Sequence, residues 1–147
     1  MTTPVQSVAK FIVQRSTLPI SNLKLQKLLY YVQGWNLGLH GEPIFTAEIQ
    51  AWVHGPVVPV VFDQYRHFRW NPIDVPQEAL KLDVAVSGHI HSVLDAYGSL
   101  TATQLEALSH DEDPWKLARN GLPANIPSRV AISHESMKKY FGKLAKG

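Results

Sequence analysis

The feature that most constrains the fold is a long apolar stripe between residues 22 and 39. Its members recur at spacings of three and four, which is the period of one helix face. They are Leu25, Leu28, Leu29, Val32, Trp35 and Leu39. Ser21 or Asn22 can cap the start, and Gly41 followed by Pro43 opposes continuation. The pattern predicts a helix over 22–39 at the centre of the protein.

Start signals predict further helices before and after this one. Thr3, Pro4 and Gln6 supply a cap, a first-turn proline and a polar residue three positions after the cap. A first helix is therefore expected over 4–16. A second apolar pattern, which begins at Leu82 and ends near Gly98, predicts the fourth helix along the chain.

Capping patterns also mark helices in the last third of the chain. Thr101 and Gln104 form a capping box, and the helix that they open should point Leu105 and Leu108 inward. Ser133 is placed to cap a C-terminal helix whose lysines gather toward its end, where the helix dipole favours positive charge.

The middle of the chain is harder to assign. Residues 44–53 hold no helical stripe, so a short extended segment is possible there. The β-branched run that follows favours a strand locally, but three of its apolar residues recur at spacings of four. These are Val57, Val61 and Tyr65. We therefore predict a helix over 56–68 with Pro56 as its first residue.

These elements predict a mainly α fold. A chain of 147 residues with 45% hydrophobic content fits one compact domain over residues 1–147. We expect six to seven helices, with at most a short extended segment near residues 44–53. No internal repeat and no low-complexity segment interrupts the pattern.

Composition excludes several classes of function. No apolar stretch approaches the roughly 20 residues of a membrane-spanning helix, and no secretory signal opens the chain, so we expect a cytoplasmic protein without membrane association. The absence of Cys excludes disulfides and thiolate chemistry. Because the net charge is only +2 and most basic residues are dispersed, direct DNA binding is not expected. Gly-rich phosphate loops and hydrolase motifs are missing, so no cofactor and no enzymatic activity are expected.

The segment His-Asp-Glu-Asp at residues 110–113 resembles a metal site at first sight. Four consecutive side chains point in several directions, however, and at most two of them could share one ion. Asp113 is better explained as the cap of a short helix that begins at Pro114. Asp111 and Glu112 are then solvated charges near the helix start, and no metal is expected.

Three other histidines could carry chemistry. His89 and His91 lie two apart on a helix, which separates their directions too far for one ion, so both are expected at the surface or its edge. His54 precedes Gly55 and Pro56, where the chain turns, and its simplest role is to orient that turn. As a general base it would need companions. The candidates are Asp63, Ser16 and Ser109. No spacing singles out any of them, so no catalytic residue is assigned.

Four blocks of the sequence together resemble a known family. They are LKLQKLLYYVQGW, AWVHGPVVPVVFDQYR, LSHDEDPWKLARNGLP and ISHESMKKYF, in this order. In order and separation they are similar to the Panacea domain, also called the SocA-like antitoxin domain. The resemblance spans roughly residues 5–141.

This resemblance implies a protein-binding module whose partner is a cognate toxin, neutralised by direct stoichiometric binding. A family member that delivers its toxin to a protease raises a second possibility, a proteolytic adaptor. Two further classes are an enzyme of unknown chemistry that uses His54 and a DNA-binding autoregulator. The family offers no catalytic set to carry over. The turn is accordingly interpreted as a hinge, in which Trp52 points inward, Gly55 permits the turn and Pro56 begins the next helix.

Exposed aromatic and Arg side chains carry much of the energy of protein interfaces. Candidates lie on the flank of the helix over 22–39 and around the end of the helix over 56–68. They are Tyr30, Tyr31, Tyr65, Arg66, His67, Arg69 and Trp70. Core burial is the competing interpretation for each aromatic residue.

Overall fold

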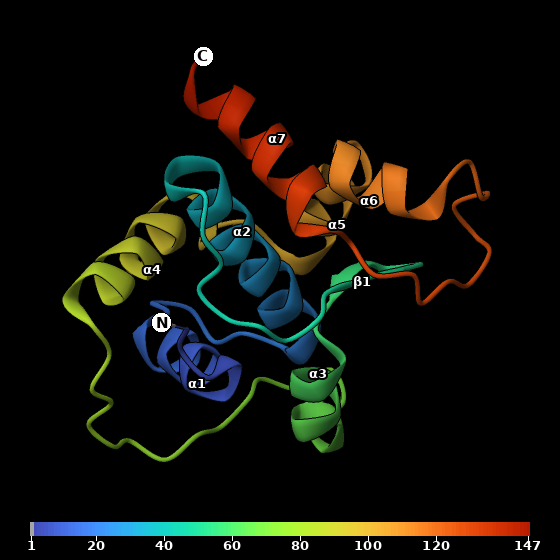
Figure 1. Ribbon diagram of the computed structural model, residues 1–147. Helices are drawn as coiled ribbons and strands as arrows, with labels where there is room; N and C mark the ends of the chain where they lie inside the picture. The colour runs from blue at the N-terminus through green and yellow to red at the C-terminus, as the bar shows by residue number, and fades with distance from the viewer. Residues whose placement is uncertain (1) are drawn as a thin grey trace.

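Helix α2, Asn22–His40, runs through the centre of the molecule, as its apolar stripe predicts. The computed structural model describes residues 2–147, and Figure 1 shows the other helices arranged around α2. The Ser21 side chain caps the start by accepting a hydrogen bond from the backbone of Lys24, and Gly41 ends the helix with a φ of 76°. Every residue from 24 to 34 is buried, so α2 is enclosed on all sides.

The mainly α fold class is confirmed. The other helices are α1 (Val5–Arg15), α3 (Pro59–Tyr65), the 3₁₀ helix η1 (Arg66–Phe68), α4 (Val84–Tyr97), α5 (Ala102–His110), α6 (Asp113–Arg119) and α7 (His134–Ala145). Two strands, β1 (Gln50–Trp52) and β2 (Gly55–Val57), form an antiparallel hairpin. The short extended segment near residues 44–53 is therefore present as β1.

Helix α7 makes the most extensive contact with α2, and glycines allow the two helices to approach (Figure 1). A Cβ atom on Gly38 would lie 2.6 Å from the carbonyl carbon of Phe141 and 2.7 Å from the backbone nitrogen of Gly142. The Phe141 ring covers Gly34 and is completely buried. The absence of side chains at these two positions of α2 thus sets the distance between the helices.

The helix over 56–68 begins later than the sequence predicts. Pro56 is paired with Ala51 in the hairpin, and α3 starts at Pro59. In a helix that began at Pro56, Pro59 would occupy a position whose backbone N–H is needed for the first hydrogen bond of the helix. At the first helical position this missing donor has no cost. The prediction that Pro56 opens the helix is therefore wrong, and the turn before it uses Gly55 at a φ of 102°.

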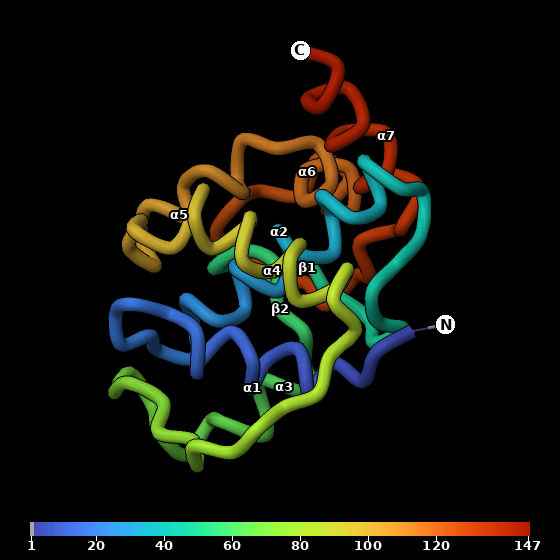
Figure 2. The backbone as a smooth tube through the Cα atoms, turned by 90° about the vertical axis from the view of Figure 1, so that its left-hand side faces the viewer, coloured from blue at the N-terminus to red at the C-terminus, as the bar shows by residue number. Residues whose placement is uncertain are grey.

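The long connection between η1 and α4 lies against α1 in both Figures 1 and 2. Gln14 donates hydrogen bonds to the carbonyl oxygens of Pro76 and Glu78, and Lys10 forms an ion pair with Glu78. Near its start, the backbone of Ile73 donates to the carbonyl of Ile20. The connection is thus held to α1 at Pro76 and Glu78 and to the segment after α1 at Ile73.

Three local assignments differ from prediction in smaller ways. Helix α1 starts one residue late, with Pro4 at the cap position and no capping side chain. In α5 the capping box at Thr101 is present and Leu105 is buried, but Leu108 is exposed. Asp113 is the first residue of α6, so it does not cap that helix.

Two glycine-to-alanine substitutions test the close crossing of α2 and α7. Gly38→Ala should lower the free energy of unfolding by about 1–3 kcal/mol, because the new Cβ meets the α7 backbone. Gly88→Ala in α4 is the matched control, since nothing lies within 4 Å of its added Cβ, and alanine should raise stability by up to about 1 kcal/mol. Chemical denaturation measures both. Equal effects of the two substitutions would contradict the steric explanation.

Candidate protein-binding site

The hairpin is held against α2 by two buried polar side chains. The Gln26 carbonyl accepts a hydrogen bond from the backbone of Val58 at 2.9 Å, while its amide donates to the Asn22 side chain at 2.8 Å. The Lys27 ammonium donates to the Pro56 carbonyl at 3.2 Å. These bonds close the outer side of β2, because they engage the backbone groups that a neighbouring strand would need.

The opposite side of the hairpin is held by α6. The Trp115 indole donates to the carbonyl of Trp52 at 2.8 Å, and the Arg119 guanidinium donates to that of Ala51 at 3.1 Å. Arg119 also donates to the carbonyls of Pro123 and Ile126, in the loop after α6. One buried arginine therefore connects β1 to the loop that passes beside it.

An apolar groove of about 330 Å³ lies on the outward face of this hairpin. Strand register explains its floor, since the face that carries Gln50 and Trp52 also carries Val57. The walls come from the start of α2, from α3, from the hairpin turn and from the loop before α7. The lining residues are Leu23, Trp52, Val53, His54, Val57, Phe62, Pro127, Ser128 and Arg129.

Aromatic and cationic side chains dominate the groove. The rings of Trp52 and Phe62 meet edge to face with centroids 5.2 Å apart, and the Arg129 guanidinium lies 4.9 Å above the Trp52 ring. Trp52 is only half-buried, so the prediction that it points into the core is wrong. Its neighbour Ala51 is the fully buried residue of the strand. Such a surface is typical of the centre of a protein interface.

His54 lies at the rim of the groove. Its side chain is 69% exposed, and its Nδ1 atom lies 3.2 Å from a carboxylate oxygen of Glu106 in α5. The suggested companions are engaged elsewhere: Asp63 pairs with Arg66, while the hydroxyls of Ser16 and Ser109 donate to backbone carbonyls. None of the three forms a hydrogen bond or ion pair with His54 in the described chain.

Tyr30 and Tyr31 do not lie on an exposed flank, so that expectation is wrong. Both are completely buried, and their hydroxyls donate to the carboxylate of Glu112 at 2.9 and 3.1 Å. Glu112 is itself only 3% exposed, which corrects the expectation of a solvated charge, whereas Asp111 is exposed. Burial raises the pKa of Glu112 to about 7, against the opposing effect of the two hydroxyl donors.

Lys27 is the second buried ionisable group of this region. Burial lowers the pKa of its ammonium group to about 7, and the nearby Glu106 carboxylate opposes that shift. The helical stripe gives no sign of this, because a lysine between two leucine positions normally extends into solvent. The feature of the sequence that could have indicated the burial of Lys27 is the density of apolar residues on more than one face of this helix.

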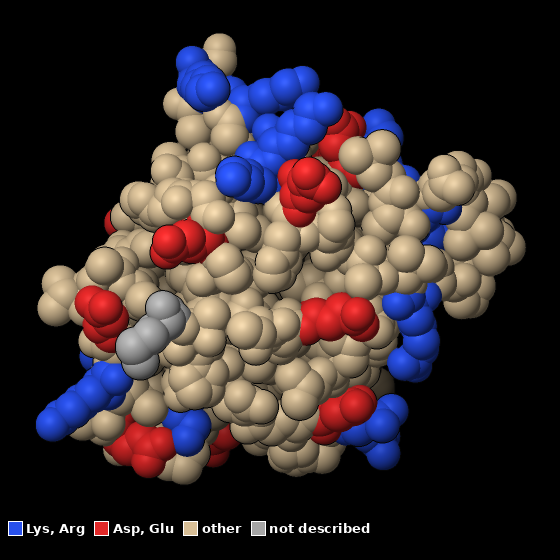
Figure 3. Space-filling model, viewed as in Figure 1, with Lys and Arg blue, Asp and Glu red and all other residues tan. Residues whose placement is uncertain are grey.

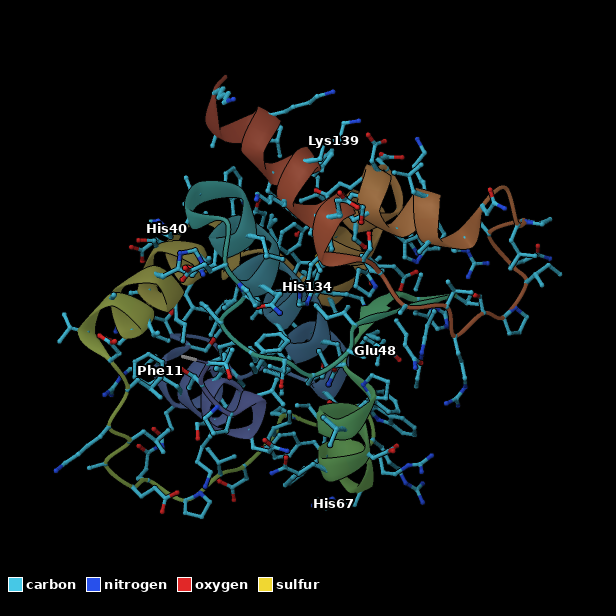
Figure 4. The ribbon with its side chains drawn as sticks, in the orientation of Figure 1. Phe11, His40, Glu48, His67, His134 and Lys139 are labelled. Carbon is cyan, nitrogen blue, oxygen red and sulfur yellow. The ribbon has the colours of Figure 1, made fainter. Side chains whose placement is uncertain are left out.

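The predicted surface at the end of α3 is partly exposed. Tyr65 is buried, with 5% exposure and no hydrogen-bond partner for its hydroxyl within the described chain, so it offers no contact surface. Arg66, His67 and Arg69 are exposed, and Trp70 is 78% exposed. Figure 4 shows His67 at the end of α3 that lies away from the hairpin. These four residues therefore form a surface separate from the groove.

The remaining candidate groups do not form a metal site in residues 2–147, where no cluster of three or more His, Asp or Glu side chains could hold an ion. His110 stacks on Trp115 with ring centroids 4.1 Å apart. His89 is half-buried at the edge of the surface, and its Nε2 atom lies 2.9 Å from the carbonyl oxygen of Val32. His91 is exposed and packs edge-on against Phe11.

Charges of both signs are mixed over the visible surface. Figure 3 shows lysines gathered over α7 with acidic side chains beside them, and large uncharged areas elsewhere on that face. None of the helices in the described chain combines the length and the apolar character that crossing a membrane requires.

Two of the buried ionisable groups, Glu112 and Lys27, should each contribute a distinctive pH dependence to stability. Folded Glu112 keeps its proton up to pH about 7, whereas the unfolded chain loses it near 4.5, so the free energy of unfolding should fall as pH rises through this window. Folded Lys27 loses its proton near 7 and the unfolded chain near 10.5, so stability should recover as pH rises further. Each window corresponds to a few kcal/mol, at roughly 1.4 kcal/mol per pKa unit.

Urea unfolding of the parent, Glu112→Gln and Lys27→Met at a series of pH values measures this. The stability difference between parent and Glu112→Gln should fall between pH about 4.5 and about 7, and the difference between parent and Lys27→Met should rise between pH about 7 and about 10.5. A constant stability difference between parent and Glu112→Gln from pH 5 to pH 7 would contradict the assignment.

A family model and a similar protein both relate this chain to the same family. A family model described as "Antitoxin SocA-like, Panacea domain" matches residues 25–116. The protein named Antitoxin SocA from Caulobacter vibrioides (strain NA1000 / CB15N) is 34% identical over 155 aligned positions, which cover 92% of this chain and 81% of that protein. No solved structure matches the chain. The family match includes α2 from Leu25 onward, the hairpin and α3, and on this evidence the chain belongs to the antitoxin SocA-like Panacea domain family.

Proposed function

We propose that this protein is an antitoxin that neutralises a cognate toxin protein by direct, stoichiometric binding, and that the groove beside Trp52 receives the toxin. Family membership supports the antitoxin role. The observation that carries the site is the cluster of half-buried Trp52 and Phe62 with exposed Arg129 around an apolar depression of about 330 Å³. Aromatic and arginine side chains around such a depression are the usual energetic centre of an interface.

The rigidity of the surroundings favours this groove over the surface at the end of α3. The hairpin beneath it is fixed on one side by Gln26 and Lys27 and on the other by Trp115 and Arg119. A preorganised surface loses little entropy when a partner binds. Trp70, by contrast, is 78% exposed, and a single exposed aromatic residue is common on protein surfaces.

Titration with the product of the neighbouring gene, as the candidate toxin, tests stoichiometric neutralisation. We expect inhibition of the purified toxin to saturate near a one-to-one ratio in a mixture that contains no protease, because binding alone blocks the toxin. Isothermal titration calorimetry gives the ratio, and the toxin's own activity assay gives the inhibition. Complete inhibition by a few per cent of this amount would indicate turnover. Inhibition that requires an added protease would indicate an adaptor.

Substitutions in the groove locate the interface. Phe62→Ala should weaken toxin binding by more than about 2 kcal/mol, roughly 30-fold in Kd, because Phe62 is half-buried and packs on Trp52. Trp70→Ala and Arg66→Ala are matched controls on the other surface and should change Kd less than about threefold. Thermal melts of each variant show whether its fold is retained. If the two controls lose binding while Phe62→Ala keeps it, the interface lies at the end of α3.

A further inference from the structure

A third extended segment lies on the outer side of β1, where the chain returns from the loop after α6 (Figure 1). Gln50 forms an antiparallel bridge with Ala131. The backbone of Ala51 donates to the carbonyl of Val130 at 2.9 Å, and the backbone of Ile132 donates to the carbonyl of Ile49 at 2.7 Å. The returning chain thus adds one isolated antiparallel bridge, flanked by two backbone hydrogen bonds, to the outer side of the two-stranded hairpin.

The outer edge of this third extended segment has no neighbouring strand in the described chain. In an antiparallel pair, the residue between two hydrogen-bonded neighbours directs its own N–H and C=O away from the partner strand. Here that residue is Ala131, and an extended chain would give Arg129 the same orientation. Within residues 2–147 the backbone groups of neither residue form a hydrogen bond. Arg129, Val130 and Ala131 are all exposed.

The other edge of the sheet, on the outer side of β2, offers no free backbone groups to a further strand. Pro56 has no backbone N–H, its carbonyl accepts from Lys27, and the N–H of Val58 is held by Gln26. An exposed, unpaired strand edge is a template for another strand, and proteins usually protect such edges. Between Arg129 and Ala131 the edge carries no proline and no covering helix.

Charge and shape indicate what kind of strand the edge accepts. The Arg129 guanidinium lies over Trp52 and pairs with no carboxylate of the described chain, so an acidic residue opposite Arg129 would complement it. Arg129 and Pro127 line the groove together. Because side chains alternate along a strand, a residue two positions from the acidic one, on the Pro127 side, would face the groove. An apolar side chain fits there.

We propose that Arg129–Ala131 receives an extended segment of the toxin by strand addition, with an acidic residue opposite Arg129 and an apolar residue two positions away in the groove. This rests on the proposed function and specifies how the partner binds. Main-chain hydrogen bonds supply affinity in this recognition mode, and the two alternate side chains supply selectivity.

Removal of one backbone donor tests the proposal. Ala131→Pro deletes an N–H that has no partner within the described chain, so the fold should be retained while the Kd for the neighbouring gene's product rises at least tenfold. Ala131→Val keeps the N–H and should stay within threefold of the parent. Ala131→Pro binding as tightly as the parent would overturn strand addition. If Phe62→Ala still loses binding in that case, the groove assignment stands.

Two measurements keep the test decisive if Ala131→Pro fails to fold. In the unmodified protein, hydrogen exchange at the Ala131 amide should slow at least tenfold in the complex, whereas the already bonded Ile132 amide serves as the internal reference. No slowing at Ala131 overturns the proposal. A displayed library of random nonapeptides should yield binders enriched in acidic and apolar residues two positions apart. Binders without this spacing, or a homodimer formed through the same edge, would also contradict it.

Discussion

The polar side chains of α2 must find their partners inside the protein, because that helix is enclosed by the rest of the chain. Burial of an unpaired amide or ammonium group is costly. Each of these side chains therefore holds a particular segment in place: Gln33 binds the backbone of Ile44 and Phe45, Gln26 binds that of Val58, and Lys27 binds Pro56. The path of the chain from residue 44 to residue 58 follows from these bonds.

The same requirement explains which predictions from sequence are correct. Ser21, Gly41, the Thr101 capping box and Ser133 act on their own backbone neighbours, and all four are found as predicted. The predictions for Tyr30 and Glu112 are wrong because the positions of these residues depend on others distant in sequence, whereas the error at Pro56 comes from a nearby residue, Pro59, which can only open the helix. Glu112, for example, is drawn inward by two hydroxyls more than 80 positions away.

The candidate site can be predicted only in part, for a related reason. The stretch from Trp52 to Pro56 is recognisable as a turn, but a strand of three residues is too short for its alternation to show which face is buried. Ala51 occupies the buried face and Trp52 the open one. Nothing in the sequence around Arg129 predicts a role in the site. Arg129 reaches the groove only because the chain after α6 passes beside β1.

The groove is lined partly by residues that the family model matches and partly by residues outside that match. Its floor and two of its walls fall within residues 25–116, the segment that the family model matches, whereas Leu23 and the loop residues Pro127, Ser128 and Arg129 lie outside it. The loop that leads to these residues has no regular secondary structure and is anchored through Arg119. Substitution in this wall leaves the α2 core untouched. A change of sequence in this loop would therefore reshape one wall of the groove while the hairpin and α2 beneath it keep their packing.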